Sequence, residues 1–211
     1  MSTFKAGAIA FLALLVGVVV ALYISPPKSN EPKYINMYPQ ARALPAFSLL
    51  DHKGEVFDLA QLQDHWSLIF VGYTFCPDIC PTTLAELKGI YPQLQEIEST
   101  HPIQVVFLSV DPKRDNTARL NEYIQFFHPD FIATSGGHDQ LFPLVRAMGM
   151  MYSISESTEN PNYLVDHSSS VVLINPLAQV IGRFKPEFTP GKLAISDGQK
   201  ILLDMPTLVS P

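Results

Sequence analysis

The sequence predicts an α/β domain, a mixed sheet flanked by helices, behind a single N-terminal transmembrane helix. Apolar, strand-like segments alternate with amphipathic, helix-like segments from residue 43 onwards, and such alternation implies a sheet covered by helices. A pair of cysteines, Cys76 and Cys80, stands between a buried strand and a helix. An uncharged, almost wholly apolar run from Ala6 to Ile24 precedes the domain.

The composition fits one globular domain with an added apolar segment. Hydrophobic residues make up 47% of the 211 residues, charged residues 16%, and the formal net charge is −6. The charges form no basic stripe, which is the electrostatic footprint of nucleic-acid binding. We therefore expect no nucleic-acid partner. Residues 43–204 contain no repeat and no internal linker, so a single domain is expected.

The run from Ala6 to Ile24 is long enough to cross a bilayer. At about 1.5 Å per residue it spans roughly 28 Å, close to the thickness of the hydrocarbon core. A cleaved signal peptide is the alternative, but the end of the run, residues 20–24, offers no pair of small residues for cleavage. We therefore expect residues 6–24 to be an uncleaved transmembrane anchor.

The charges beside this run are nearly balanced, with Lys5 on one side and Lys28 and Lys33 on the other. A short basic head before a large C-terminal domain is the usual layout of a signal anchor, so residues 1–5 should be cytoplasmic. No Arg- and Ser-rich transit segment precedes the run, which favours a bacterial protein. We expect a single-pass protein of the bacterial inner membrane whose domain faces the periplasm.

Residues 25–42 form the predicted tether between the anchor and the domain. This stretch is polar and rich in proline, and it shows neither helical nor strand periodicity. Such a composition is typical of an extended linker. The sequence therefore places the domain at residues 43–211.

The first elements of the domain are a hairpin, a buried strand and a helix. Two apolar segments within residues 47–59 flank a turn that contains Gly54, which predicts the hairpin. Residues 67–73 form a continuous apolar run, as expected of a strand that is buried on both faces. The helix is expected to begin at Pro81, because proline is frequent at the first helical position. Its apolar residues recur at helical spacing: Leu84, Leu87, Ile90, Tyr91 and Leu94.

The rest of the domain continues the alternation. Residues 103–110 form a second apolar run and predict a second buried strand, and residues 115–127 carry apolar side chains on one helical face. The remaining predicted elements are a short strand over 131–134, a helix over 138–148, a hairpin over 171–184 and a closing helix over 189–203, which Gly198 weakens. A core strand followed by a cysteine pair and a helix is the thioredoxin-like arrangement.

The cysteine pair, Cys76 and Cys80, can form a disulfide, bind a soft metal ion, or alternate between the two. A disulfide here closes a very small loop and contributes little stability, so chemistry explains the pair better. If the helix begins at Pro81, Cys80 is its N-cap and the helix dipole favours the Cys80 thiolate. The spacing exceeds the redox motif C-x-x-C by one residue, which gives two sulfurs room to bind one soft ion.

A third ligand could come from His167, which lies just before an apolar strand, at an end of the sheet where loops converge. The residues alone favour a structural or surface histidine over a ligand at this position. Asp78 and Asp166 could orient ligands or could be plain turn residues. Three methionines could suggest a thioether site, but at helix-end spacing they are interpreted as core residues: Met148, Met150 and Met151. Three charged residues are interpreted as a loop-stabilising cluster: Asp111, Arg114 and Asp115.

Three segments in the same order resemble the hallmarks of the SCO/SenC family. They are residues 72–81 (GYTFCPDICP), residues 109–115 (SVDPKRD) and residues 166–168 (DHS). The resemblance extends over about residues 43–184, which is nearly the whole domain. It implies a thioredoxin-like fold that binds copper, as Cu(I), Cu(II) or both, through two cysteines and one histidine.

Carried over to this chain, the implied copper ligands are Cys76, Cys80 and His167. Members of the family deliver copper to the dinuclear copper site of cytochrome c oxidase, or reduce the cysteines of that site. The resemblance therefore implies a metallochaperone rather than an enzyme, with the copper-site subunit of the oxidase or another copper chaperone as its partner. The alternative is a thiol–disulfide oxidoreductase that uses Cys76 and Cys80 as a redox pair to keep the cysteines of the oxidase subunit reduced.

Overall fold

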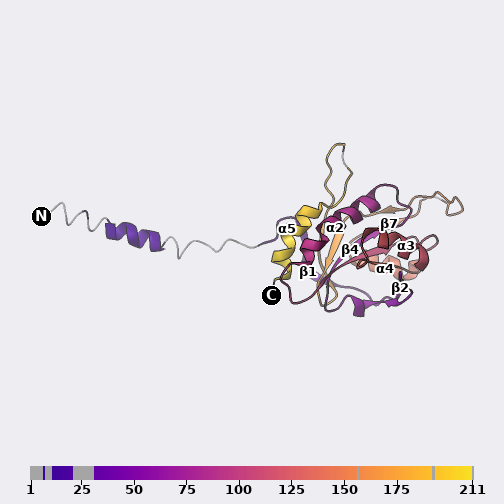
Figure 1. Ribbon diagram of the computed structural model, residues 1–211, viewed down its shortest axis with the longest axis horizontal. Coiled ribbons are helices and arrows are strands. Elements are labelled where there is room, and N and C mark those ends of the chain that lie inside the picture. Colours follow the sequence, from indigo (N-terminus) through magenta and orange to yellow (C-terminus); the bar gives the residue numbers. More distant parts are fainter. Residues whose placement is uncertain (1–6, 8–10, 21–30, 156, 192, 211) are drawn as a thin grey trace. The chain divides into compact units, whose positions relative to one another are not determined.

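The computed structural model describes residues 7, 11–20, 31–155, 157–191 and 193–210 (Figure 1). The chain separates into two compact units, residues 1–31 and residues 32–211. In the first unit, residues 11–20 are helical. Among the described residues, no helix is long and apolar enough to cross a membrane. The predicted anchor over 6–24 lies partly outside the described residues and stays a prediction, as does the predicted cytoplasmic head over 1–5.

The second unit is built on an eight-stranded mixed sheet with the strand order β1-β10-β9-β4-β5-β6-β2-β3, and a separate small sheet pairs β7 with β8. The strands are β1 (Ile35–Ala43), β2 (Leu49–Asp51), β3 (Val56–Phe57), β4 (Trp66–Gly72), β5 (Ile103–Ser109), β6 (Ile132–Ser135), β7 (Tyr152–Ser153), β8 (Asp166–His167), β9 (Val171–Ile174) and β10 (Gln179–Phe184). The helices are η1 (Leu59–Gln61), α2 (Ile79–Gln95), α3 (Thr117–Phe127), α4 (His138–Ala147) and α5 (Gly198–Val209). This architecture confirms the predicted α/β fold.

The two central strands, β4 and β5, run parallel along their whole length, from Trp66 opposite Ile103 to Gly72 opposite Ser109. Every residue of β5 is buried, as are all of β4 after Trp66, which confirms the prediction that both are core strands. Parallel strands end at the same edge of a sheet. The loops that leave β4 and β5 therefore begin side by side, and they carry the candidate site.

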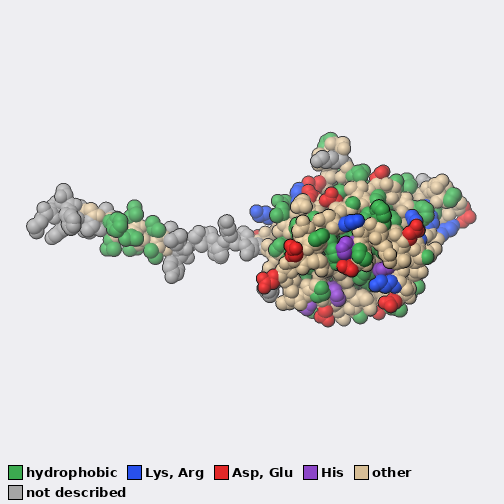
Figure 2. Space-filling model, in the orientation of Figure 1, with side chains coloured by type: hydrophobic (Ala, Val, Ile, Leu, Met, Phe, Trp, Pro, Cys, Tyr) green, Lys and Arg blue, Asp and Glu red, His purple; other side chains and the backbone are tan. Residues whose placement is uncertain are grey.

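The helix after the cysteine loop, α2, packs beside α5 and also contacts α3 (Figure 1). Its predicted apolar stripe is buried, because Leu84, Leu87, Ile90 and Leu94 are each at most 1% exposed. On the face of the molecule seen in Figure 2, acidic and basic side chains are interspersed. The predicted hairpins are also confirmed as the antiparallel pairs β2–β3 and β9–β10.

The predicted tether over 25–42 is wrong in its second half. Residues 35–43 form the edge strand β1, which pairs antiparallel with β10. The register shifts between Met37 and Arg42, so Pro39 lies in an irregular stretch where a missing N–H is tolerated. Most of β1 is exposed, so the strand lacks the apolar alternation by which a sequence reveals one. The domain therefore begins before residue 43, and residues 25–30 lie outside the described residues.

The closing helix α5 begins later than the predicted residue 189. Its N-cap is Asp197, whose carboxylate accepts a hydrogen bond from the backbone N–H of Gln199 at 2.8 Å. Gly198 is the first helical residue, so it lies at the end of the helix and not in its interior. A Cβ at this position would lie 2.9 Å from Oε2 of Glu86 on α2, so glycine permits the close approach of α5 to α2.

Candidate metal centre

The two cysteines lie on either side of the start of α2. Cys76 is half-buried in the loop after β4, whereas Cys80 is the second residue of α2 and is fully buried. Gly72, the last residue of β4, makes room for Cys80. A Cβ at position 72 would lie 2.6 Å from Sγ of Cys80 and 2.8 Å from the ring of Phe107. This role of Gly72 was not predicted from the sequence, although the glycine stands in the motif that carries the cysteines.

His167 reaches the cysteines from the small second sheet. It lies on β8, where it pairs with Tyr152 of β7. The rings of Phe70 and Tyr73 meet the imidazole edge-on, with centroid distances of 6.0 Å and 5.8 Å. The Nδ1 atom lies 3.3 Å from the carbonyl oxygen of Ser168, and a carbonyl can only accept, so Nδ1 carries the proton. The other nitrogen, Nε2, is then free to act as a ligand.

The three predicted ligands come together in space. The sulfurs of Cys76 and Cys80 and a ring nitrogen of His167 all lie within 4.8 Å of one another, and Nε2 of His167 is 3.4 Å from Sγ of Cys80. Two thiol sulfurs and one imidazole nitrogen form a donor set that suits a soft metal ion such as Cu(I) or Zn(II). The residues could therefore hold a metal ion, and their role as ligands stays a prediction.

The two thiols differ in acidity, in the opposite sense to the sequence prediction. The pKa of Cys76 is lowered to about 4, chiefly by a hydrogen bond from the Cys80 side chain, and backbone N–H groups add to this effect. Burial of Cys76 opposes the shift. Burial raises the pKa of Cys80 well above its ordinary value. The helix begins at Ile79 with Asp78 as N-cap, so Cys80 is not the N-cap. The backbone N–H of Cys80, in the first turn, instead donates a hydrogen bond to Sγ of Cys76 at 3.4 Å.

The two aspartates named from the sequence do not touch the ligands through their carboxylates in the part of the chain that the structure describes. Asp78 acts through its backbone, which helps to lower the pKa of Cys76, and its side chain makes no capping hydrogen bond. The carboxylate of Asp166 accepts a hydrogen bond from the hydroxyl of Ser155 at 3.2 Å. Their predicted orienting roles stay predictions.

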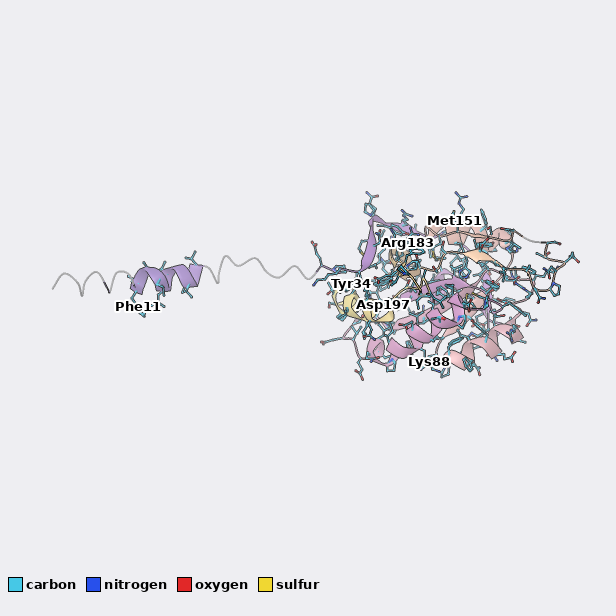
Figure 3. The ribbon with its side chains drawn as sticks, turned by 90° about the horizontal axis from the view of Figure 1, so that it is seen from above. Phe11, Tyr34, Lys88, Met151, Arg183 and Asp197 are labelled. Atoms are coloured by element: carbon cyan, nitrogen blue, oxygen red, sulfur yellow. The ribbon has the colours of Figure 1, made fainter. Side chains whose placement is uncertain are left out.

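The methionines divide between core and surface. Met148 and Met150 are at most 1% exposed and fill the core. Met151 is 75% exposed and lies at the edge of the domain in the view of Figure 3. It lines an open hollow of about 360 Å³ together with His167 and Ser168. The imidazole can therefore be reached from outside the protein.

The comparison with known proteins agrees with this arrangement. The sequence model of the SCO1/SenC family matches residues 36–200. The chain belongs to the SCO1/SenC family. Its membership explains why the cysteine motif, the segment after β5 and the Asp166–His167 pair occur together and in this order.

Individual proteins of this family are similar to the chain in sequence and in structure. The SCO2-like protein of Rickettsia prowazekii is 36% identical over 183 residues, which cover 83% of this chain and 87% of that protein. The mitochondrial SCO2 homologue of Bos taurus is 38% identical over 130 residues, 62% of this chain and only 49% of the bovine protein. The crystal structure of ScoI of Arabidopsis thaliana with copper bound is 28% identical, covers 77% of this chain and 97% of that chain, and superimposes with a TM-score of 0.62.

Proposed function

We propose that this protein is a copper chaperone, which binds one copper ion through Cys76, Cys80 and His167 and passes it to a partner by ligand exchange. The observation that carries the proposal is the convergence of two thiol sulfurs and one imidazole nitrogen within 4.8 Å. Soft sulfur ligands select Cu(I), and an imidazole suits either valence of copper. The related Arabidopsis protein, whose structure is described with copper bound, supports the choice of this metal.

The position of the site suits transfer rather than storage. Cys76 and His167 are only half-buried, and an open hollow leads to the imidazole. An incoming ligand from a partner can therefore bind the ion before the last ligand of this chain leaves. Because three ligands leave copper coordinatively unsaturated, such an exchange does not require the free ion to enter water.

The proposed partner is the copper-site subunit of cytochrome c oxidase or another copper chaperone, and the proposed location is the bacterial inner membrane with the domain in the periplasm. The partner rests on the family to which the chain belongs. The location rests on the apolar run over residues 6–24. Protease treatment of spheroplasts tests the location, because a periplasmic domain is degraded while the membrane is intact, whereas a cytoplasmic domain is protected.

Copper titration of the reduced full-length protein tests the function. Competition with a coloured Cu(I) chelator should show one ion per chain, and Cys76→Ser should abolish tight binding. His167→Ala should weaken binding by tenfold or more, about 1.4 kcal/mol. His65→Ala is the matched control, because among the described residues the ring of His65 bonds only to the nearby carbonyl of Gln63, at 2.8 Å. A His167→Ala variant with the affinity of the wild type would disprove the three-ligand site.

A second function, thiol–disulfide exchange, is favoured by the acidity of Cys76. Its thiolate would attack a disulfide of the partner, form a mixed disulfide and expel the partner's other sulfur as a thiolate. Cys80 would then lose its proton and attack Cys76, which releases the second thiol of the partner and leaves a Cys76–Cys80 disulfide. The partner gains two electrons and this chain loses two. In this alternative the copper affinity is incidental to the function.

A further inference from the structure

The loop between β5 and α3, residues 110–116, contacts both halves of the candidate metal centre. It begins where β5 ends beside β4, at the edge of the sheet from which the cysteine loop also leaves. On one side it bonds to Thr74, two residues before Cys76. On the other side it bonds to the segment 158–163, which precedes His167.

Asp115 holds the cysteine side of the site. Its carboxylate accepts hydrogen bonds from the backbone N–H of Thr74 at 2.9 Å and from the hydroxyl of Thr74 at 2.7 Å, and the hydroxyl of Ser109 donates to it as well. Asp115 is 2% exposed, so water does not compete for these bonds. The backbone N–H of Cys76 in turn donates to the carbonyl of Tyr73 at 3.2 Å. Asp115 therefore fixes Thr74, which lies two residues before Cys76 in a loop that is itself closed by a hydrogen bond.

Asp111 holds the histidine side. Its fully buried carboxylate accepts hydrogen bonds from the hydroxyl of Tyr163 and from Nε of Arg114. The guanidinium of Arg114 lies over the ring of Tyr163, 3.5 Å from the centroid, and donates to the carbonyl of Pro161 at 3.0 Å. Lys113 adds a bond of 2.8 Å to the carbonyl of Thr158. Three neighbouring residues of one loop thus anchor the segment that leads to His167.

We propose that the loop over residues 110–116 is the positioning element of the metal centre. Asp115 fixes the cysteine loop, and Asp111, through Tyr163, fixes the segment that carries His167. The spacing of two carboxylates on one loop therefore sets the separation between the sulfurs and the imidazole. Tyr163 is a positioning residue, because it acts on a bound ion only through His167. The inference rests on the proposed copper site for its functional consequence.

Tyr163→Phe in the full-length protein tests this role, since it removes one hydroxyl and keeps the ring beneath Arg114. Copper(I) affinity should fall by about tenfold, as when a residue that orients a ligand is lost. In a His167→Ala background the same change should have no further effect, because residues that act through one another are not additive. Tyr38→Phe is the matched control: the hydroxyl of Tyr38 donates to the carbonyl of Met148 at 3.0 Å, and its loss should leave the copper affinity unchanged.

An equal loss of affinity with and without His167 would overturn the proposal, because Tyr163 would then act by loosening the fold as a whole. A metal-free readout separates this result from a failure of the proposed function. The nitrogen-15 signal of Nε2 of His167, which lies 3.4 Å from Sγ of Cys80, should shift in Tyr163→Phe but not in Tyr38→Phe. If the wild type binds no copper and the signal still shifts, the copper function fails while the positioning role stands. An unchanged signal overturns the positioning role.

Discussion

The backbone N–H of Cys80 donates a hydrogen bond to Sγ of Cys76, with a donor–acceptor distance of 3.4 Å. One cysteine of the pair therefore stabilises the thiolate of the other. Because Cys80 is itself fully buried, its own thiol keeps the proton. The asymmetry follows chiefly from the side-chain hydrogen bond of Cys80 to Cys76 and from the burial of Cys80. Backbone N–H groups at the start of α2 add to it. The two sulfurs are thus unequal before any metal ion binds.

The acidity of Cys76 predicts an unusual dependence of its reactivity on pH. Because the thiolate is the nucleophile and the pKa is lowered from 9.0 to about 4, alkylation of the reduced, metal-free protein should proceed at a nearly constant rate down to about pH 5. The rate should fall as the pH passes through about 4. Mass spectrometry after timed exposure to iodoacetamide measures this rate. Cys76→Ser should leave only the unreactive Cys80, and a tenfold loss of rate per pH unit below about pH 8 would contradict the prediction.

The same shift predicts how the stability of the reduced protein varies with pH. The pKa of Cys76 is lower in the folded state, so ionisation of this thiol stabilises the fold. The contribution is complete above pH 9.0, decreases as the pH falls, and is gone below about pH 4. Urea denaturation at several pH values, compared with Cys76→Ser, measures it. The difference in unfolding free energy between the wild type and Cys76→Ser should therefore vary with pH. If it stays constant between about pH 4 and about pH 9, the pKa of Cys76 is not lowered in the folded state.

Gly72 should be intolerant of any side chain. Gly72→Ala places a Cβ 2.6 Å from Sγ of Cys80 and 2.8 Å from the ring of Phe107, so the free energy of unfolding should fall by about 1–3 kcal/mol. The displaced sulfur should also weaken copper binding. Gly89→Ala is the control, because Gly89 lies on α2 with nothing within 4 Å of a Cβ, and alanine should stabilise the helix by about 0.5–1 kcal/mol. Thermal unfolding measures the stability of both variants. Equal changes in stability for Gly72→Ala and Gly89→Ala would contradict the close contact at Gly72.

Asp204 on α5 should be essential for the attachment of β1. Its carboxylate accepts hydrogen bonds from three consecutive backbone N–H groups, those of Lys33, Tyr34 and Ile35, at 2.6–2.8 Å. Asp204→Ala leaves these donors without their acceptor, which should cost about 3 kcal/mol of unfolding free energy. Asp197→Ala removes only the N-cap of the same helix and should cost about 1 kcal/mol. Urea denaturation measures both, and a similar cost for the two variants would argue against the anchoring role.

The elements that the sequence predicted well are those whose signal is local. The buried strands β4 and β5 are continuous apolar runs, and α2 carries its buried leucines at helical spacing. Strand β1 escaped prediction because its signal is not local. It lies at the edge of the sheet, is mostly exposed, and is defined by pairing with β10, far along the chain, as in the pair Ile35 and Phe184.

The candidate site also combines features with a local sequence signal and features without one. The cysteine pair is a local motif, whereas His167 lies 87 residues from Cys80, and only the resemblance to a family joined them. The acidity was assigned to the wrong cysteine for two reasons. The hydrogen bond between the two side chains and the burial of Cys80 leave no pattern in the sequence, and α2 begins at Ile79 rather than at Pro81. Such a difference of two residues is within the usual uncertainty of helix boundaries, yet it decides which sulfur receives the N–H groups. Contacts such as that of Thr74 with Asp115 have no pattern in the sequence at all.

The unequal cysteines also predict which sulfur attacks first if the protein exchanges disulfides. Cys76 is half-buried and acidic, whereas Cys80 is fully buried with a raised pKa, so Cys76 should be the attacking thiol. Cys80→Ser should therefore trap a mixed disulfide between Cys76 and a model disulfide peptide, because no second thiol remains to resolve it. Cys76→Ser should trap no mixed disulfide. Non-reducing electrophoresis detects the mixed disulfide in either variant. Trapping by Cys76→Ser alone would reverse the order of attack. A third outcome is that neither variant forms an adduct although Cys76 reacts with iodoacetamide. The reaction with iodoacetamide would show that Cys76 is nucleophilic, so the missing adduct would mean that the thiolate serves metal binding and not disulfide exchange.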